Sequence, residues 1–142
     1  MPDEPEEVAR NEWGAILHYE DRGLLELRWF ATTAGMGDDG FRETLELFAG
    51  EAERFRPANL LVDSMEFRHR MGEGVNEWRD ANIIPRYNAA GVRKFAFVVP
   101  EGVPGTVESG GEPAVDGPAN FPTGWFSSRD RADRWLSEGP EG

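Results

Sequence analysis

The sequence predicts an α/β domain whose core is a mixed β-sheet of about five strands covered by helices. Two short apolar runs, Leu60-Leu61-Val62-Asp63 and residues 92–99, flank a segment of helical length over residues 73–90. A strand, a crossover helix and a second strand of this size make a βαβ unit, so the core should contain parallel strands. A hairpin pattern earlier in the chain adds antiparallel strands and makes the sheet mixed.

The N-terminal part of the chain predicts a tail followed by this hairpin. Residues 1–12 are acidic, contain prolines and lack apolar periodicity, so we expect a flexible tail. Residues 13–20 and 24–30 are apolar and aromatic runs with partial alternation, which is typical of strands. They are joined by a short polar segment in which Gly23 can adopt the positive φ of a tight turn. We therefore expect two antiparallel strands.

An amphipathic helix is predicted between Asp38 and Pro57. Asp38 and Asp39 place a capping group and negative charge at its start, and the proline ends it. The apolar residues of this segment recur at spacings of four and three, as one face of a helix requires. These residues are Phe41, Leu45, Phe48, Ala52 and Phe55.

The second helix, over residues 73–90, contains Pro85 in its interior. Proline lacks the backbone N–H and clashes with the preceding turn. The sequence therefore predicts a kink or two abutting helical pieces at this point.

The C-terminal part predicts a long irregular segment, a strand and a final helix. Residues 101–120 are rich in Gly and Pro and hold no aromatic or cationic anchor, so we expect disorder rather than a functional lid. A short strand over residues 123–126 precedes a helix capped by Ser127 or Ser128. The expected order is β-β-α-β-α-β-β-α, in a single domain over residues 13–138.

Composition excludes several classes of function. The 142 residues include 27 acidic and 15 basic side chains, a net charge of -12, and no cysteine. Such a field repels nucleic acids and anionic membrane surfaces. No apolar run approaches the roughly 20 residues of a membrane helix, and the acidic start is unlike a signal peptide, so we expect a cytoplasmic protein without membrane insertion. The two histidines are isolated in the sequence, which predicts no metal site, and no cofactor motif is present.

Several segments together resemble the small STAS-like (SpoIIAA-like) domains, which are named after sulfate transporters and anti-sigma-factor antagonists. The resemblance spans residues 13–136 and implies the STAS-like fold; some members of that group are described as similar to the CRAL-TRIO lipid carriers. The segments that carry it are Leu60-Leu61-Val62-Asp63, Phe67, Glu77-Trp78, Ile84-Pro85-Arg86, residues 90–98, Trp125-Phe126-Ser127-Ser128 and Ala132-Asp133-Arg134-Trp135-Leu136.

The chain departs from this family pattern at two places. Anti-sigma-factor antagonists of this fold carry a phosphorylatable serine at the start of the helix after the central strand. Residues 69–74, which match that region, contain no Ser or Thr. The irregular segment over residues 101–120 also replaces what is a further helix in many relatives. We therefore expect no phosphorylation switch, and the second departure weakens the analogy with a lipid pocket.

A candidate ligand site follows the central strand. Asp63, Arg68, His69 and Arg70 lie at or just beyond its carboxyl end, near a predicted helix N-terminus. Ligands of open α/β sheets gather at that edge, where exposed amides favour anions. The alternative, which we favour, is that Asp63 pairs with an arginine and that the loop only solvates its charges.

A candidate interface lies on the second helix. Trp78 and Tyr87 are aromatic residues beyond those that this helix needs for the core, since Ile83 and Ile84 already serve that purpose. They indicate self-association as a homodimer. For Trp125 and Trp135 we expect burial.

These observations predict a non-catalytic STAS-like module for protein interaction or regulation, with no catalytic residue. The alternative function is a carrier of a small molecule or lipid, and a small anionic or apolar ligand is compatible with it. A sizeable apolar cavity beneath residues 73–90 would favour the carrier. A filled core with an exposed aromatic patch would favour the interaction module.

Overall fold

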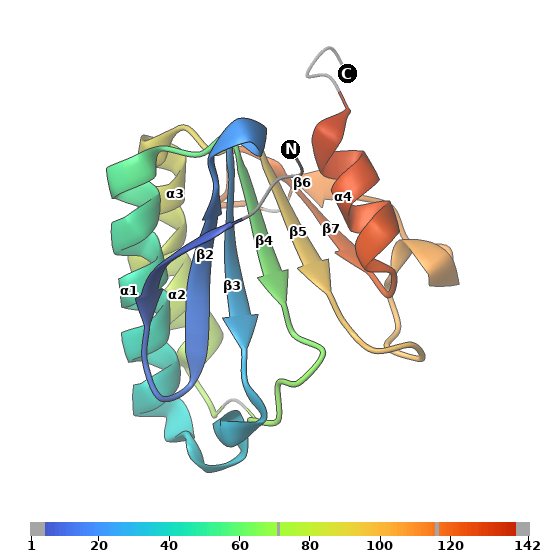
Figure 1. Cartoon of the computed structure of the whole chain (residues 1–142). Helices are drawn as coiled ribbons and strands as arrows, with labels where there is room; N and C mark the ends of the chain where they lie inside the picture. The colour runs from blue at the N-terminus through green and yellow to red at the C-terminus, as the bar shows by residue number, and fades with distance from the viewer. Residues whose placement is uncertain (1–4, 71, 116, 139–142) are drawn as a thin grey trace.

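A computed structural model of the chain (Figure 1) describes residues 5–70, 72–115 and 117–138. The strands are β1 (Glu6–Arg10), β2 (Gly14–Tyr19), β3 (Leu24–Trp29), β4 (Asn59–Asp63), β5 (Lys94–Val98), β6 (Ala114–Val115) and β7 (Pro122–Phe126). The α-helices are α1 (Gly37–Phe55), α2 (Val75–Asn82), α3 (Ile84–Ala90) and α4 (Arg129–Ser137). Three 3₁₀ segments are η1 (Glu20–Arg22), η2 (Ala31–Gly35) and η3 (Val107–Ser109).

The strands form one mixed sheet in the order β1-β2-β3-β4-β5-β7-β6. The chain passes through α1 between β3 and β4, and through α2 and α3 between β4 and β5, and both strand pairs are parallel. The pair of β5 and β7 is also parallel, whereas β1–β2, β2–β3 and β6–β7 are antiparallel. The α/β class and the parallel core are thus confirmed, but the described residues form seven strands, not five.

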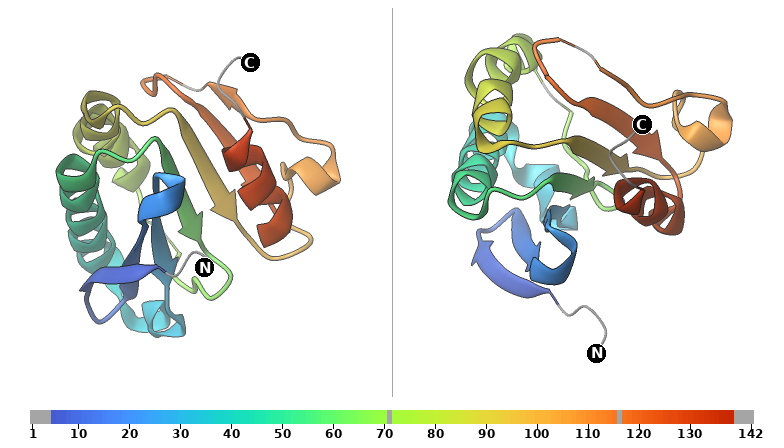
Figure 2. Two further views of the ribbon diagram at one scale, coloured as in Figure 1. Left: turned by 45° about the horizontal axis from the view of Figure 1, so that its top comes forward. Right: turned by 90° about the horizontal axis from the view of Figure 1, so that it is seen from above.

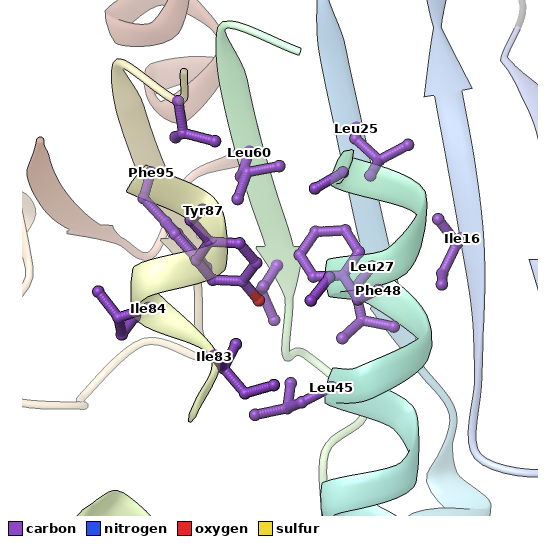
Figure 3. Packing of buried hydrophobic residues seen from close by; sticks show 14 of the residues in the cluster. Ile16, Leu25, Leu27, Leu45, Phe48, Leu60, Ile83, Ile84, Tyr87 and Phe95 are labelled. Atoms are coloured by element: carbon purple, nitrogen blue, oxygen red, sulfur yellow. The ribbon is translucent and has the colours of Figure 1, made fainter. Parts of the chain in front are cut away.

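Helices cover the two faces of the sheet unequally. Figure 2 shows α1, α2 and α3 on one face and α4 alone on the other. Because side chains alternate along a strand, Phe95 of β5 faces the first layer and Ala96 faces the second. Figure 3 shows the larger core, in which Phe48 of α1 and Tyr87 of α3 meet with ring centroids 6.0 Å apart.

The predicted break at Pro85 is confirmed. Helix α2 ends at Asn82 and α3 begins at Ile84, so the chain forms two abutting helices. Pro85 lies in the first turn of α3, where a missing N–H costs no helical hydrogen bond.

The predicted flexible tail over residues 1–12 is wrong for Glu6–Arg10, which form the edge strand β1. This strand pairs with β2, and its Val8 and Ala9 pack against the core. The Asn11 side chain fixes the turn, because its Oδ1 accepts hydrogen bonds from the amides of Trp13 and Gly14 at 2.8 and 3.0 Å. Residues 1–4 of the tail lie outside the described residues.

The prediction of disorder over residues 101–120 is also wrong for most of that segment. It contains η3 and β6, and polar rather than aromatic or cationic groups hold it in place. The hydroxyl of Thr106 is buried and bonds Ser109 at 2.9 Å, and the Glu108 carboxylate accepts from the Ser127 amide at 2.8 Å. Asp116 lies outside the described residues.

On the α4 face, a buried carboxylate connects the sheet to the last helix. The Glu26 side chain is fully buried and accepts bonds from Tyr19 Oη at 2.8 Å and from Arg129 Nη2 at 2.9 Å. Arg28 Nη2 lies 3.0 Å from the same carboxylate. The Ser128 hydroxyl caps α4 by accepting from the Arg131 amide, as the sequence predicts. Charge pairing at the start of α4 therefore positions this helix on the sheet.

Removal of the Arg129 guanidinium should weaken the fold. Arg129→Met leaves the Glu26 carboxylate buried with fewer donors, so we expect the free energy of unfolding to fall by about 3 kcal/mol. The double variant Glu26→Gln with Arg129→Met also removes the buried negative charge and should recover part of the loss. Urea denaturation measures the free energy of unfolding of both variants. An Arg129→Met variant as stable as the wild type would contradict the stabilising role of the Glu26–Arg129 pair.

Candidate ligand pocket

The first face of the sheet is wider than its helical cover. Helix α1 forms one row, and α2 with α3 forms a second (Figure 2). Two rows at spacings of about 10 Å span roughly four strands that lie about 4.8 Å apart. The part of this face over β7 therefore lacks a helix, and a pocket of about 390 Å³ lies between α2–α3, the strands β5 and β7, and residues 112–115 and 117–119.

Stacked aromatic side chains form one wall of the pocket. Phe97 and Trp125 are partners across β5 and β7, and their rings stack with centroids 4.1 Å apart at 8°. Phe95, two residues before Phe97 and thus on the same face, stacks on Phe97 at 4.8 Å. Tyr87 of α3 continues this aromatic row, with its ring 5.6 Å from that of Phe95. The strand register therefore fixes the shape of this wall.

Apolar side chains from β3, α1, β4 and α3 close one end of the pocket. The rings of Trp29 in β3 and Phe41 in α1 stack at 5.6 Å. Leu45, Val62 and Ile84 complete this apolar lining. All of these residues belong to the large core, so the pocket extends into it from the surface.

Residues 112–115 and 117–119 form the outer wall, and a side chain of α3 binds this segment. Asn88 Nδ2 donates to the Pro118 carbonyl at 2.9 Å, and Asn88 Oδ1 accepts from the Asn120 amide at 2.9 Å. The side chain of Ala119 is buried against the core. One asparagine thus fixes a segment that the sequence predicts to be irregular.

Polar residues also line the pocket, and Arg79 is one of them. Its Nη2 lies 3.4 Å from Asp80 Oδ1, whereas its Nε is buried and has no hydrogen-bond partner among the described residues. The other charged lining residue is Glu112, which is exposed. Burial raises the pKa of Tyr87 well above its ordinary value, so its hydroxyl stays protonated. The unpartnered Nε therefore lies inside the wall of the pocket and not on its accessible surface.

The four residues of the predicted anion site lie apart from this pocket. Asp63 faces α4, where its Oδ2 is 3.9 Å from both Arg28 Nε and Arg129 Nη1. Arg68 is exposed and pairs with Glu66 at 3.2 Å, and Arg70 is exposed without an ion pair to a described residue. The pairing of Asp63 with arginines agrees with the alternative that we favour for this loop. Anion binding at this edge remains a prediction.

His69, the fourth residue, connects its loop to the start of α1. Its Nε2 lies 2.8 Å from Asp38 Oδ1, and its ring contacts those of Phe41 and Phe67. The hydrogen bonds from His69 and from the Gly72 amide lower the pKa of Asp38. Asp38 therefore binds the neighbouring loop, whereas the sequence predicts that it caps α1.

The predicted interface residues lie in different environments. Tyr87 is only 2% exposed, so the prediction that it contributes to a surface is corrected: its ring fills the core beside Phe48 and Phe95. Trp78 is partly buried with the Arg42 guanidinium 5.9 Å from its ring, and its role in a dimer remains a prediction. Trp125, for which we expect burial, is 40% exposed at the pocket.

Comparisons with protein families, with curated proteins and with solved structures give no match. Among the described residues, no group of three His, Cys, Asp or Glu side chains is arranged to hold a metal ion. No helix within the described part of the chain is both long and apolar enough to cross a membrane.

Sequence reasoning missed the pocket, although part of its signal was present. Phe95 and Phe97 are two residues apart and must share a face, and Trp125 follows on a neighbouring strand. The signal for Arg79 was absent, because its burial depends on where residues 112–115 and 117–119 cross the sheet. Which parts of a sheet face the helices cover depends on tertiary packing, and local sequence patterns do not show it.

Arg79 should be dispensable for stability. Its unpaired Nε costs free energy in the folded state, so Arg79→Met should leave the free energy of unfolding unchanged or raise it. The control is Arg86→Met, since Arg86 of α3 binds Glu53 and Glu46 of α1 at 2.7 to 2.9 Å and its loss should cost about 1 kcal/mol. Urea denaturation compares the two variants, and a larger loss at Arg79 would assign it a structural role.

Proposed function

We propose that this chain is a non-catalytic binding protein that carries a small, largely apolar molecule in the pocket beside α2 and α3. The observation that supports this function is the 390 Å³ pocket with an aromatic wall. Ligand sites in proteins are concave, mostly apolar, and about 300–1,000 Å³ in volume, with a few polar groups that orient the ligand.

The pocket supports the carrier over the interaction module. An apolar cavity next to residues 73–90 is the feature that distinguishes the two functions, and Arg79, Asp80, Ile84 and Tyr87 from this segment line the pocket. Protein cores are generally packed without gaps of this size, so an empty pocket of about 390 Å³ next to the core is compatible with a bound ligand. The carrier function does not depend on membership of the STAS-like group, which remains a prediction.

The rim of the pocket offers an entry route. Val115 is 60% exposed and Trp125 is 40% exposed, and both line the pocket. A ligand can therefore reach the aromatic wall from solvent over an apolar rim.

The same exposed rim also favours a second candidate, the STAS-like interaction or regulatory module. Exposed apolar side chains that lie close together are typical of a surface that contacts a partner, including a second copy of the chain. The size of the particle in light scattering tests self-association of the chain.

Occupation of the pocket can be tested with a neutral fluorescent dye such as Nile red. We expect the dye to bind the wild-type protein and to lose at least about tenfold in affinity when Thr123→Phe places a ring in the pocket from β7. The matched control is Thr32→Phe, which makes the same change at an exposed position outside the pocket. Equal dye affinity of wild type and Thr123→Phe, or no dye binding to the wild type, would contradict the proposed function.

A further inference from the structure

We infer that the pocket takes a small organic cation, an amine with a compact apolar body, and that Trp125 and Glu112 hold its ammonium group at the mouth of the pocket. This inference rests on the proposed function and names the chemical class of its ligand. It follows from three properties of the pocket: a partly exposed indole, a neighbouring carboxylate without a partner, and the sign of the local charge.

The indole of Trp125 is available to a cation at the rim. Phe97 stacks on it with ring centroids 4.1 Å apart at 8°, so one face of the indole is covered. Trp125 is nevertheless 40% exposed, and its other face and its edges supply this exposed surface. The face of an indole carries the negative part of its quadrupole and attracts a cation more strongly than other aromatic side chains do.

The Glu112 side chain lies next to Trp125. The β6–β7 register, continued by two residues beyond Ala114, puts Glu112 opposite Trp125. The segment still follows β7 at this point, because a Cβ on Gly124 would lie 3.3 Å from Pro113 Cγ. Residues opposite each other in antiparallel strands are neighbours on one face of the sheet, and both Glu112 and Trp125 line the pocket. One ammonium group can therefore contact the carboxylate and the indole together.

Glu112 has no partner among the described residues. Its side chain is exposed, and within the described part of the chain neither a hydrogen bond nor an ion pair reaches its carboxylate. Glu108, in the same segment, shows the contrast: its carboxylate accepts from the Ser127 amide at 2.8 Å and lies 4.0 Å from Arg131 Nε. A ligand cation at Glu112 therefore displaces no internal bond.

The local charge favours a cation over an anion. The charged residues of the lining are Arg79, Asp80 and Glu112, which leaves one net negative charge. Arg79 lies on α2, on a different wall from Glu112, and Asp80 at 3.4 Å offsets its charge. The net charge of -12 on the whole chain raises the local concentration of cations. The ammonium group stays partly hydrated at the exposed rim while the apolar body enters the pocket, so no charge is buried.

Three naphthyl compounds of similar size separate the effect of charge from that of shape. Naphthylmethylamine is protonated near neutral pH, naphthylmethanol is neutral, and naphthoate is an anion. We expect the amine to bind wild-type protein about tenfold more tightly than the alcohol, and naphthoate to bind more weakly than the alcohol. Calorimetric titration measures the three affinities.

Two variants assign the preference to Glu112 and Trp125. Glu112→Gln keeps the size of the side chain and removes its charge, so the ratio of amine to alcohol affinity should fall from about tenfold to about threefold. Trp125→Leu should also lower this ratio, because leucine offers no ring face. The matched control is Glu43→Gln, which makes the same change at an exposed position of α1 outside the pocket and should keep the ratio.

Four results would overturn the inference. These are binding of the alcohol as tight as that of the amine, tighter binding of naphthoate than of the alcohol, an unchanged ratio in Glu112→Gln, and an equal fall of the ratio in Glu43→Gln. If none of the three compounds binds while Nile red binds and Thr123→Phe weakens the dye, the inference fails and the proposed function stands. If the dye also fails to bind, the proposed function and the inference are both wrong.

Discussion

The dimensions of the sheet relative to its helices determine the rest of this structure. Seven strands in one sheet present a face that two rows of helices cannot cover, because a helix row spans roughly two strands. Over β7 the side chains that would meet a helix instead border the pocket, whose other wall is formed by residues 112–115 and 117–119. A loop fills space less completely than a helix, and the remaining gap is the pocket.

The opposite face of the sheet is covered in a different way. A single helix, α4, packs over β5 and β7 there, and its apolar residues Ala132 and Leu136 are buried. Arg129 at the start of α4 reaches the carboxylate of Glu26 on β3. Charge pairing thus connects α4 to the centre of the sheet. The pocket lies on the other face, beside α2 and α3.

Local patterns predicted the elements, but not how they cover each other. The break at Pro85 and the cap at Ser128 follow from the chemistry of single residues, and both are present. Strand β1 was missed because three of its five residues are charged and the segment forms a strand only through its pairing with β2. The segment around Pro118 was missed because a side chain far along the sequence, Asn88, fixes it.

For the predicted anion site too, the sequence indicates where the residues lie but not which partners they contact. The sequence places Asp63, Arg68, His69 and Arg70 at the carboxyl edge of the central strand, and the fold puts them there. Two of the four, however, have partners from distant parts of the chain: Asp63 approaches Arg129, and His69 binds Asp38. Whether a polar residue is free to bind a ligand depends on such long-range partners, which periodicity and local motifs do not encode.

The central claim is that a small apolar ligand enters the pocket on the α1–α3 face. Isotope-filtered NMR of the labelled protein with unlabelled Nile red tests it most directly, because intermolecular NOEs report contacts between the dye and individual methyl groups. We expect NOEs from the aromatic protons of the dye to Ile84 and Ala119, which line the pocket. NOEs confined to Ala132 and Leu136, on the opposite face of the sheet, would contradict the account.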